Sequence, residues 1–360
     1  MPLRILSKIL ILSAVFLTIG FYVSINENNE DTILIKENNT SEVKEQNISQ
    51  NPVNKPSKKI ISEKPKEGLA LLIGKNEEDL VKELGSPLRI DESMYGYQWY
   101  IYNQNSKGYL QVGVENKRIV TIFAIGQNLD VAPFEIGQPV EEIFNTHYID
   151  TNVNLEFKGN SYRFELNDTD LNLRPMVQLG DIFVQLYIDK FTGNLSSVRF
   201  LDASTLIKQR PYELVYNGVL IQAPEPSEER QRKIEEDTEQ QIFDITNVLR
   251  ERSKLKVLKW DENTAKAAFQ HSKDMSENND FSHTSKKFGD LDKRLKTAEV
   301  VYKSAGENIA ANYTDGPAVV EGWLNSKGHR EALLNKEYSH LGVGVYEKYY
   351  TQNFIQKIEQ

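Results

Sequence analysis

Three residues in the last third of the chain carry side chains suited to acid–base or metal chemistry. His283 follows a Phe-Ser pair, Glu307 lies in a Gly-Glu-Asn sequence, and His329 lies in a Gly-His-Arg sequence. Two imidazoles and one carboxylate, with a fourth position left open, are one ligand set of a catalytic zinc site. The three residues are 24 and 22 positions apart, so their spacing alone does not show that they meet.

Each of these residues also has a purely structural interpretation. His283 would end a helix, where a histidine can cap carbonyl groups. Glu307 would start a helix, where a carboxylate is favoured near the backbone amides. His329 could bond to Glu307 without any metal. A weak or conditional metal site, a metal-free polar cluster and a direct catalytic role therefore all stay open.

Other catalytic patterns receive little support from the sequence. Ser326 and His329 are three residues apart and could form a hydrolase dyad, but this spacing is common and no third orienting group can be named. The chain has no His-Glu-x-x-His helix, no Gly-x-Ser-x-Gly elbow and no phosphate-binding loop. His271 falls on the apolar side of a predicted helix, which favours core packing. His147 and His340 are interpreted as structural.

Charge and cysteine content exclude several classes of protein. The formal net charge of −9 argues against a nucleic-acid-binding protein and against electrostatic docking on anionic lipid. The chain has no cysteine, so disulfides, thiolate metal sites and a lipidated cysteine are ruled out. The folded parts must therefore be stable through their own cores.

The N-terminus predicts export and attachment to a membrane. Arg4 and Lys8 precede an uncharged run over residues 9–25, and acidic residues follow it. Basic residues on the leading side keep the N-terminus in the cytoplasm and send the rest of the chain outside. We interpret residues 1–25 as a signal anchor, with a cleaved signal peptide as the alternative. The main part of the chain would then be extracytoplasmic, or secreted if the signal is cleaved.

The region between this segment and the last domain divides into three parts. Residues 26–66 are rich in Asn, Lys, Glu and Pro and predict a disordered linker. Residues 67–203 predict a duplicated helix-plus-β-hairpin unit of the α+β class, with the glycines Gly74 and Gly137 in matching positions. The aromatic residues Tyr97 and Trp99 would match Tyr162 and Phe164. Residues 204–232 contain several prolines and predict a hinge.

Residues 233–360 predict a second α+β domain. Ile234, Ile242 and Leu249 lie on one face of a helix that Ser227 can cap. Asp261 is placed to cap the next helix, and Asp315 precedes a third. Two strands over residues 341–346 and 349–355 close the chain, with a tight turn between them.

Six motifs in this last domain occur together: HSKDM, FSHTS, GENIA, WLNSKGHR, NKEYSHLGVGVY and YYTQNF. In this order they resemble bacterial members of the CAP superfamily, which unites cysteine-rich secretory proteins, antigen 5 and pathogenesis-related proteins. The resemblance covers about 125 residues and implies an α-β-α sandwich with an open cleft. The preceding repeated unit resembles the N-terminal domain that accompanies CAP domains in some bacterial proteins.

The resemblance also implies a ligand set. In many members two histidines and two glutamates hold a divalent metal, often zinc, and His283, Glu307 and His329 match three of the four. The second glutamate is replaced by Ser326, which is a poor ligand. The cleft would thus comprise His283, Glu307, Ser326 and His329, with zinc or another divalent metal bound weakly or not at all.

The leading functional hypothesis is a membrane-tethered binding module. The resemblance implies wall components, lipids or protein partners at the cell surface as ligands, without choosing among them. The alternative is a zinc-dependent hydrolase that acts on extracellular peptide or wall material. In a third interpretation the repeated domain binds the partner and the CAP domain is regulatory. Whether the chain is an enzyme stays open.

Overall fold

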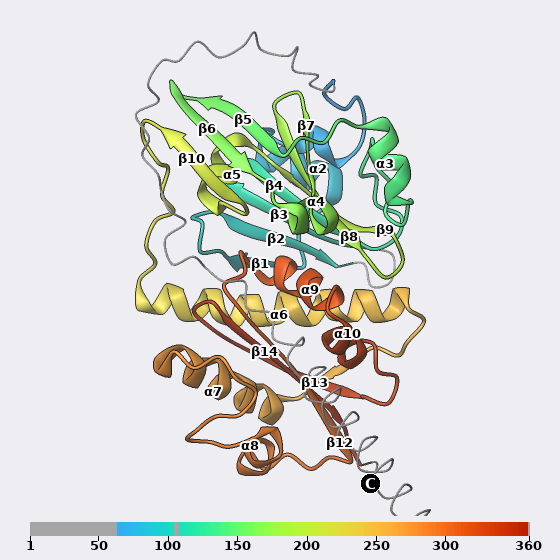
Figure 1. The fold of residues 1–360 in the computed structure, drawn as a ribbon, viewed down its shortest axis with the longest axis vertical. Coiled ribbons are helices and arrows are strands. Elements are labelled where there is room, and N and C mark those ends of the chain that lie inside the picture. Colours follow the sequence, from blue (N-terminus) through green and yellow to red (C-terminus); the bar gives the residue numbers. More distant parts are fainter. Residues whose placement is uncertain (1–62, 104–107, 359–360) are drawn as a thin grey trace, which may run out of the picture.

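The structure is a computed structural model that describes residues 63–103 and 108–358. An N-terminal domain forms the upper part of Figure 1, and a C-terminal domain, which includes the long helix α6 (Glu228–Arg252), forms the lower part. None of the helices in the described residues combines the length and the apolar character needed to span a membrane. The predicted anchor, residues 1–25, lies outside the described residues, and so does the predicted linker, residues 26–66, apart from its last four residues.

The N-terminal domain is built on a seven-stranded sheet in the order β1-β2-β3-β4-β9-β8-β7, with antiparallel neighbours. One face is covered by apolar residues from short helical segments, among them Leu72, Leu80 and Ile143. The strands and segments are η1 (Leu69–Leu72), α2 (Glu77–Leu84), β1 (Arg89–Glu92), β2 (Gln98–Asn103), β3 (Tyr109–Glu115), β4 (Arg118–Ile125), α3 (Val140–Thr146), β7 (Met176–Leu179), β8 (Ile182–Asp189) and β9 (Asn194–Leu201).

The two halves of this sheet have matching starts. Gly74 donates its N–H to the Ile119 carbonyl just before α2, and Gly137 donates to Leu195 just before α3. Both glycines have positive φ, which favours glycine. The predicted duplication stays a prediction. The aromatic match, however, is not found: Trp99 lies on β2 of the seven-stranded sheet and Tyr97 directly precedes that strand, whereas Tyr162 lies in a separate sheet.

The separate sheet has three strands in the order β10-β6-β5. It comprises β5 (Asn152–Phe157), β6 (Asn160–Glu165) and β10 (Glu213–Asn217), and α4 (Asp168–Leu173) and α5 (Ala203–Gln209) lie nearby in the chain. The helix α5 and the strand β10 fall within the predicted hinge. These two elements form because Leu206, Ile207 and Leu214 join the apolar core of this sheet. The segments that contain proline, residues 210–212 and 218–227, have no regular structure.

The C-terminal domain has three layers, as the α-β-α prediction requires. Its four-stranded sheet has the order β11-β13-β14-β12. The helix α7 packs closely on one face of this sheet. The glycines Gly342 and Gly344 allow this, because a Cβ at either position would overlap the backbone of Ala265 or Phe269. The other elements are β11 (Lys259–Trp260), α7 (Glu262–Asn278), α8 (Leu291–Thr297), β12 (Ser304–Ala311), α9 (Gly316–Leu324), α10 (Lys327–Leu333), β13 (His340–Tyr346) and β14 (Tyr349–Gln356).

The two predicted helix caps are present, because the side chains of Ser227 and Asp261 accept hydrogen bonds from backbone amides at the starts of α6 and α7. Asp315, which was predicted only to precede a helix, caps α9 in the same way. Two local predictions were wrong. His283 lies beyond the end of α7, and Glu307 lies in the strand β12, because residues 304–311 pair along their whole length with β14.

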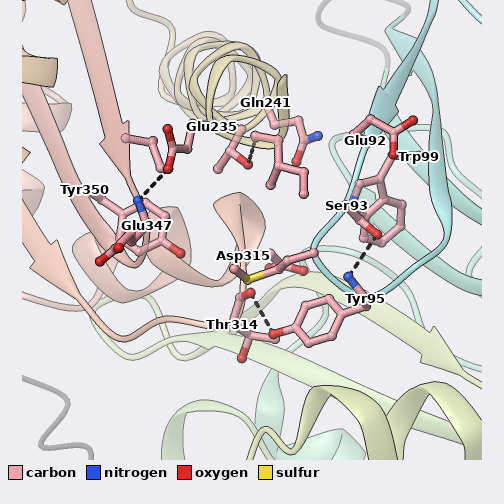
Figure 2. Close-up of a pocket in the computed structure, with 14 residues that line it drawn as sticks. Glu92, Ser93, Tyr95, Trp99, Glu235, Gln241, Thr314, Asp315, Glu347 and Tyr350 are labelled. Atoms are coloured by element: carbon pink, nitrogen blue, oxygen red, sulfur yellow. Dashed lines mark hydrogen bonds between the residues drawn. The ribbon is translucent and has the colours of Figure 1, made fainter. Parts of the chain in front are cut away.

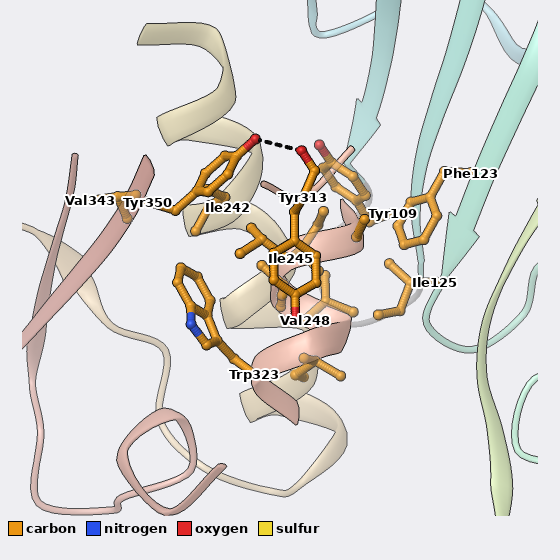
Figure 3. Packing of buried hydrophobic residues seen from close by; sticks show 14 of the residues in the cluster. Tyr109, Phe123, Ile125, Ile242, Ile245, Val248, Tyr313, Trp323, Val343 and Tyr350 are labelled. Atoms are coloured by element: carbon orange, nitrogen blue, oxygen red, sulfur yellow. Dashed lines mark hydrogen bonds between the residues drawn. The ribbon is translucent and has the colours of Figure 1, made fainter. Parts of the chain in front are cut away.

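The two domains share one hydrophobic core. Tyr109, Phe123 and Ile125 from the N-terminal sheet belong to the same buried cluster as Ile245 and Trp323 from the C-terminal domain. Figure 3 shows these groups meeting around α6 and α9. Because apolar burial is the main favourable contribution to folding, neither domain keeps a complete core without the other.

Buried polar contacts complete this interface. Arg199 pairs with Asp315 at 2.7 Å, with both side chains at most 9% exposed. Arg330 donates to both oxygens of Asp189 at 2.9 and 3.0 Å. Figure 2 shows a pocket between the domains, where the hydroxyl of Tyr95 donates to the Thr314 carbonyl. Its volume of about 20 Å³ has room for roughly one water molecule.

Candidate functional site

The candidate site lies on β12, the edge strand of the C-terminal sheet, and two neighbouring residues of this strand organise it. Successive side chains of a strand point to opposite faces. Glu307 bonds to His283, and Asn308 donates to the carbonyl oxygen of His329 at 3.1 Å. The four predicted residues are thus held as two hydrogen-bonded pairs, His283 with Glu307 and Ser326 with His329.

A third residue dominates the first pair. Arg294, on α8, donates from Nη1 to Oε2 of Glu307 at 2.7 Å and from Nη2 to Oε1 at 3.0 Å. The same Nη2 donates to the carbonyl oxygen of His283 at 2.9 Å. Two parallel bonds between a guanidinium and a carboxylate combine charge with fixed geometry. Arg294 therefore fixes both the orientation of Glu307 and the loop that carries His283.

The electrostatics of Glu307 follow from these partners. Its side chain is 4% exposed, and burial alone would raise its pKa. Hydrogen bonds from His283 and Arg294, together with the charge of Arg294, instead lower the pKa of Glu307 to about 2. The carboxylate is consequently ionised at every pH at which the protein would function. His283 is 44% exposed and is the member of this pair that solvent can reach.

Behind Glu307 lies a fully buried imidazole. Nε2 of His271 is 3.9 Å from Oε1 of Glu307, and burial lowers the pKa of His271 to about 4. Neither of its ring nitrogens has a hydrogen-bond partner among the described residues. Asn353 pairs with Glu307 across the two strands, and its buried Nδ2 and Oδ1 atoms also have no hydrogen-bond partner among the described residues. Core packing of His271 was predicted and its burial agrees, but its place beside the carboxylate was missed.

The second pair is local to one helix. Ser326 occupies the N-cap position of α10, and its Oγ is 2.8 Å from Nδ1 of His329. The side chain of Ser326 does not cap the helix amides, so the hydroxyl bonds the imidazole instead. This is the contact that a serine–histidine dyad requires, although His329 is only 2% exposed. The structure does not test this dyad as a catalytic unit, and the sequence gives it little support.

The residues do not fit a divalent metal as they are arranged. Both oxygens of Glu307 accept hydrogen bonds from Arg294, so a cation would compete with the guanidinium for the same carboxylate and be repelled by its charge. In residues 63–103 and 108–358, no group of three or more His, Asp or Glu side chains is placed so that it could hold a metal ion. Zinc binding at His283, Glu307 and His329 stays a prediction for a titration to test.

Comparison with known proteins places this geometry in a family. Residues 243–358 match the model of the cysteine-rich secretory protein family, and residues 73–212 match the CAP-associated N-terminal domain. A Bacillus subtilis relative, uncharacterized membrane protein YlbC, is 54% identical over 293 residues, which are 81% of this chain and 85% of the relative. The chain belongs to the cysteine-rich secretory protein (CAP) family.

Two solved structures have the same architecture as this CAP protein. An extracellular SCP-domain protein from Bacillus anthracis matches with a TM-score of 0.78 and 43% identity, over 84% of this chain and 100% of that one. A cysteine-rich secretory protein from Staphylococcus aureus matches with a TM-score of 0.73 and 30% identity, over 82% and 98%. The predicted pairing of a CAP domain with a CAP-associated N-terminal domain is confirmed.

Proposed function

We propose that this CAP protein is an extracytoplasmic binding protein, tethered to the membrane by its N-terminal segment, whose cleft around His283 binds cell-wall polymer without a metal. The observation that carries the proposal is the ion pair between Arg294 and Glu307. Because the guanidinium and the carboxylate are already paired, the group left to bond a ligand here is the exposed imidazole of His283.

The chemistry of the cleft favours a ligand rich in hydroxyl and amide groups. Such a ligand can exchange hydrogen bonds with the exposed imidazole of His283, whereas an anionic lipid surface needs unpaired cations. The formal net charge of −9 also disfavours binding to an anionic lipid surface. Tethering is supported by the relative named as a membrane protein and by the basic-then-apolar pattern of residues 1–25.

The test is co-sedimentation of the full chain in detergent with isolated cell-wall polymer. We expect His283→Ala to weaken retention about tenfold, because one lost hydrogen bond contributes roughly 1.5 kcal/mol. His147→Ala, in the N-terminal domain, is the matched control and should leave retention unchanged. The proposal fails if wall retention does not depend on His283, or if a histidine-dependent interaction is found only with lipid vesicles or with a protein partner.

A further inference from the structure

A groove of about 600 Å³ lies in the N-terminal domain, lined by none of the candidate residues of the CAP domain. It lies between β5 and β7, the last strands of two different sheets. In Figure 1 these strands lie at the upper end of the molecule, while α8 and β12 lie at the lower end. The groove is lined by Asn154, Leu155, Glu156, Phe157, Gln178, Gly180, Asp181, Phe183, Asp202 and Ala203.

The groove combines an apolar floor with an acidic rim. Leu155 and Phe183 are buried members of the core beneath it, and Phe157 packs against that core. Glu156, Asp181 and Asp202 supply three carboxylates, and none of the lining residues is basic. An occupant that fits both features is an extended segment with apolar side chains and lysines. In addition, β5 and β7 each have one described sheet neighbour, β6 and β8, so each leaves a strand edge that a further segment could join.

The chain itself brings such a segment to this rim. Nζ of Lys64 is 3.0 Å from Oδ1 of Asp181. A Cβ placed on Gly180 would lie 3.1 Å from the Cβ of Lys64 and 3.5 Å from its backbone N, so the backbone at Lys64 runs against the turn between β7 and β8. The described chain starts only one residue earlier, at position 63. The residues before Lys64 are therefore connected to the chain at the edge of the groove.

The preceding residues have the required composition. Residues 55–62 read KPSKKIIS, with three lysines, two isoleucines and no acidic residue. Ile60 is four residues before Lys64, which is about 13 Å of extended chain and enough to enter the groove. Because the segment belongs to the same chain, its effective concentration is of millimolar order, so a weak interaction is sufficient.

We propose that residues 55–62 occupy this groove as an extended strand. Ile60 and Ile61 supply the apolar contacts to Leu155 and Phe183, and Lys58 and Lys59 pair with the carboxylates of the rim. The membrane-proximal segment is then fixed at the end of the molecule opposite α8 and β12. If the tethering proposed above holds, this docking directs the CAP cleft away from the membrane.

Hydrogen–deuterium exchange of the full chain in detergent tests the docking. In the double variant Ile60→Asp, Ile61→Asp, we expect amides of β5 and β7 to exchange at least tenfold faster than in the wild type. The matched control is Ile33→Asp, Ile35→Asp, which makes the same change further from the groove and should not alter exchange there. Equal exchange at both strands in the wild type and in the Ile60 and Ile61 variant overturns the proposal.

Disulfide trapping separates the possible occupants, since the chain has no cysteine of its own. Lys59→Cys combined with Glu156→Cys should form a bond within one chain, at least fivefold faster than Ile33→Cys combined with Glu156→Cys. Bonds formed between two chains would assign the groove to a second copy and overturn docking by the same chain. Equal rates for the two pairs would also overturn it. Neither readout depends on wall binding, so the two proposals fail separately.

Discussion

Replacing Glu321 by Gln should stabilise the protein at alkaline pH and have little effect at acidic pH. Glu321 lies on α9 and is 2% exposed at the domain interface. Its Oε1 accepts hydrogen bonds from the hydroxyls of Ser196 at 3.0 Å and Ser197 at 2.5 Å, both on β9. Its Oε2 has no hydrogen-bond partner among the described residues. The ionised form is therefore buried with incomplete compensation.

The magnitude follows from the pKa. Burial, opposed by the hydrogen bonds from Ser197 and Ser196 and by the charge of Arg252, raises the pKa of Glu321 from 4.5 to about 7. Each unit of pKa corresponds to about 1.4 kcal/mol, so the ionised carboxylate costs about 3 kcal/mol. Between pH 4.5 and 7 the folded state binds more protons than the unfolded state. The contribution of this group to stability is consequently present below pH 4.5 and is lost as the pH rises through 7.

The assay is urea unfolding of the full chain in detergent at pH 5, 6, 7 and 8, followed by tryptophan fluorescence. We expect Glu321→Gln to exceed the wild type by about 3 kcal/mol at pH 8 and to differ by less than about 1 kcal/mol at pH 5. Glu141→Gln, at an exposed position of α3, is the control and should change neither value. The reasoning is refuted if the difference between wild type and Glu321→Gln does not change with pH.

Four further predictions concern the cleft. Arg294→Gln should cost about 3–5 kcal/mol in urea unfolding at pH 7, because it leaves the buried Glu307 without its cation. Lys296→Gln, on the exposed side of α8, is the control and should change the free energy of unfolding far less. Glu307 has a lowered pKa, so its contribution to stability is present above pH 4.5 and is lost as the pH falls toward 2. The free energy of unfolding of Glu307→Gln should therefore not show this decrease between pH 4.5 and 2. Calorimetric titration of the full chain with zinc should show no saturable binding, and one-to-one binding that disappears in both His283→Ala and His329→Ala would establish the metal site instead. A serine-reactive phosphonate should label Ser326 no faster in the wild type than in His329→Ala; faster labelling that needs His329 would support a hydrolase dyad.

Local chemistry made part of this fold predictable. Side chains such as Ser227 and Asp261 cap helices through bonds to residues three positions away, so the sequence contains the whole interaction. The strand assignment of Glu307 is different, because its cross-strand neighbour is Asn353 and nothing near Glu307 in sequence reveals that pairing. The same holds for the shared core, in which Phe123 and Trp323 lie in one cluster although they are far apart in the chain.

The metal prediction is best judged by the charge of the cleft. The ligand set implied by the family resemblance has two carboxylates, whose charge a divalent cation balances. This chain has one carboxylate, since Ser326 replaces the second, and the single positive charge of Arg294 balances it. Arg294 could not be identified from sequence, because it lies on a helix of only seven residues in a lysine-rich segment that predicts a solvated loop. The serine and the arginine are therefore best understood together. Arg294 already balances the charge of Glu307, and a divalent cation would add charge that no second carboxylate is present to balance.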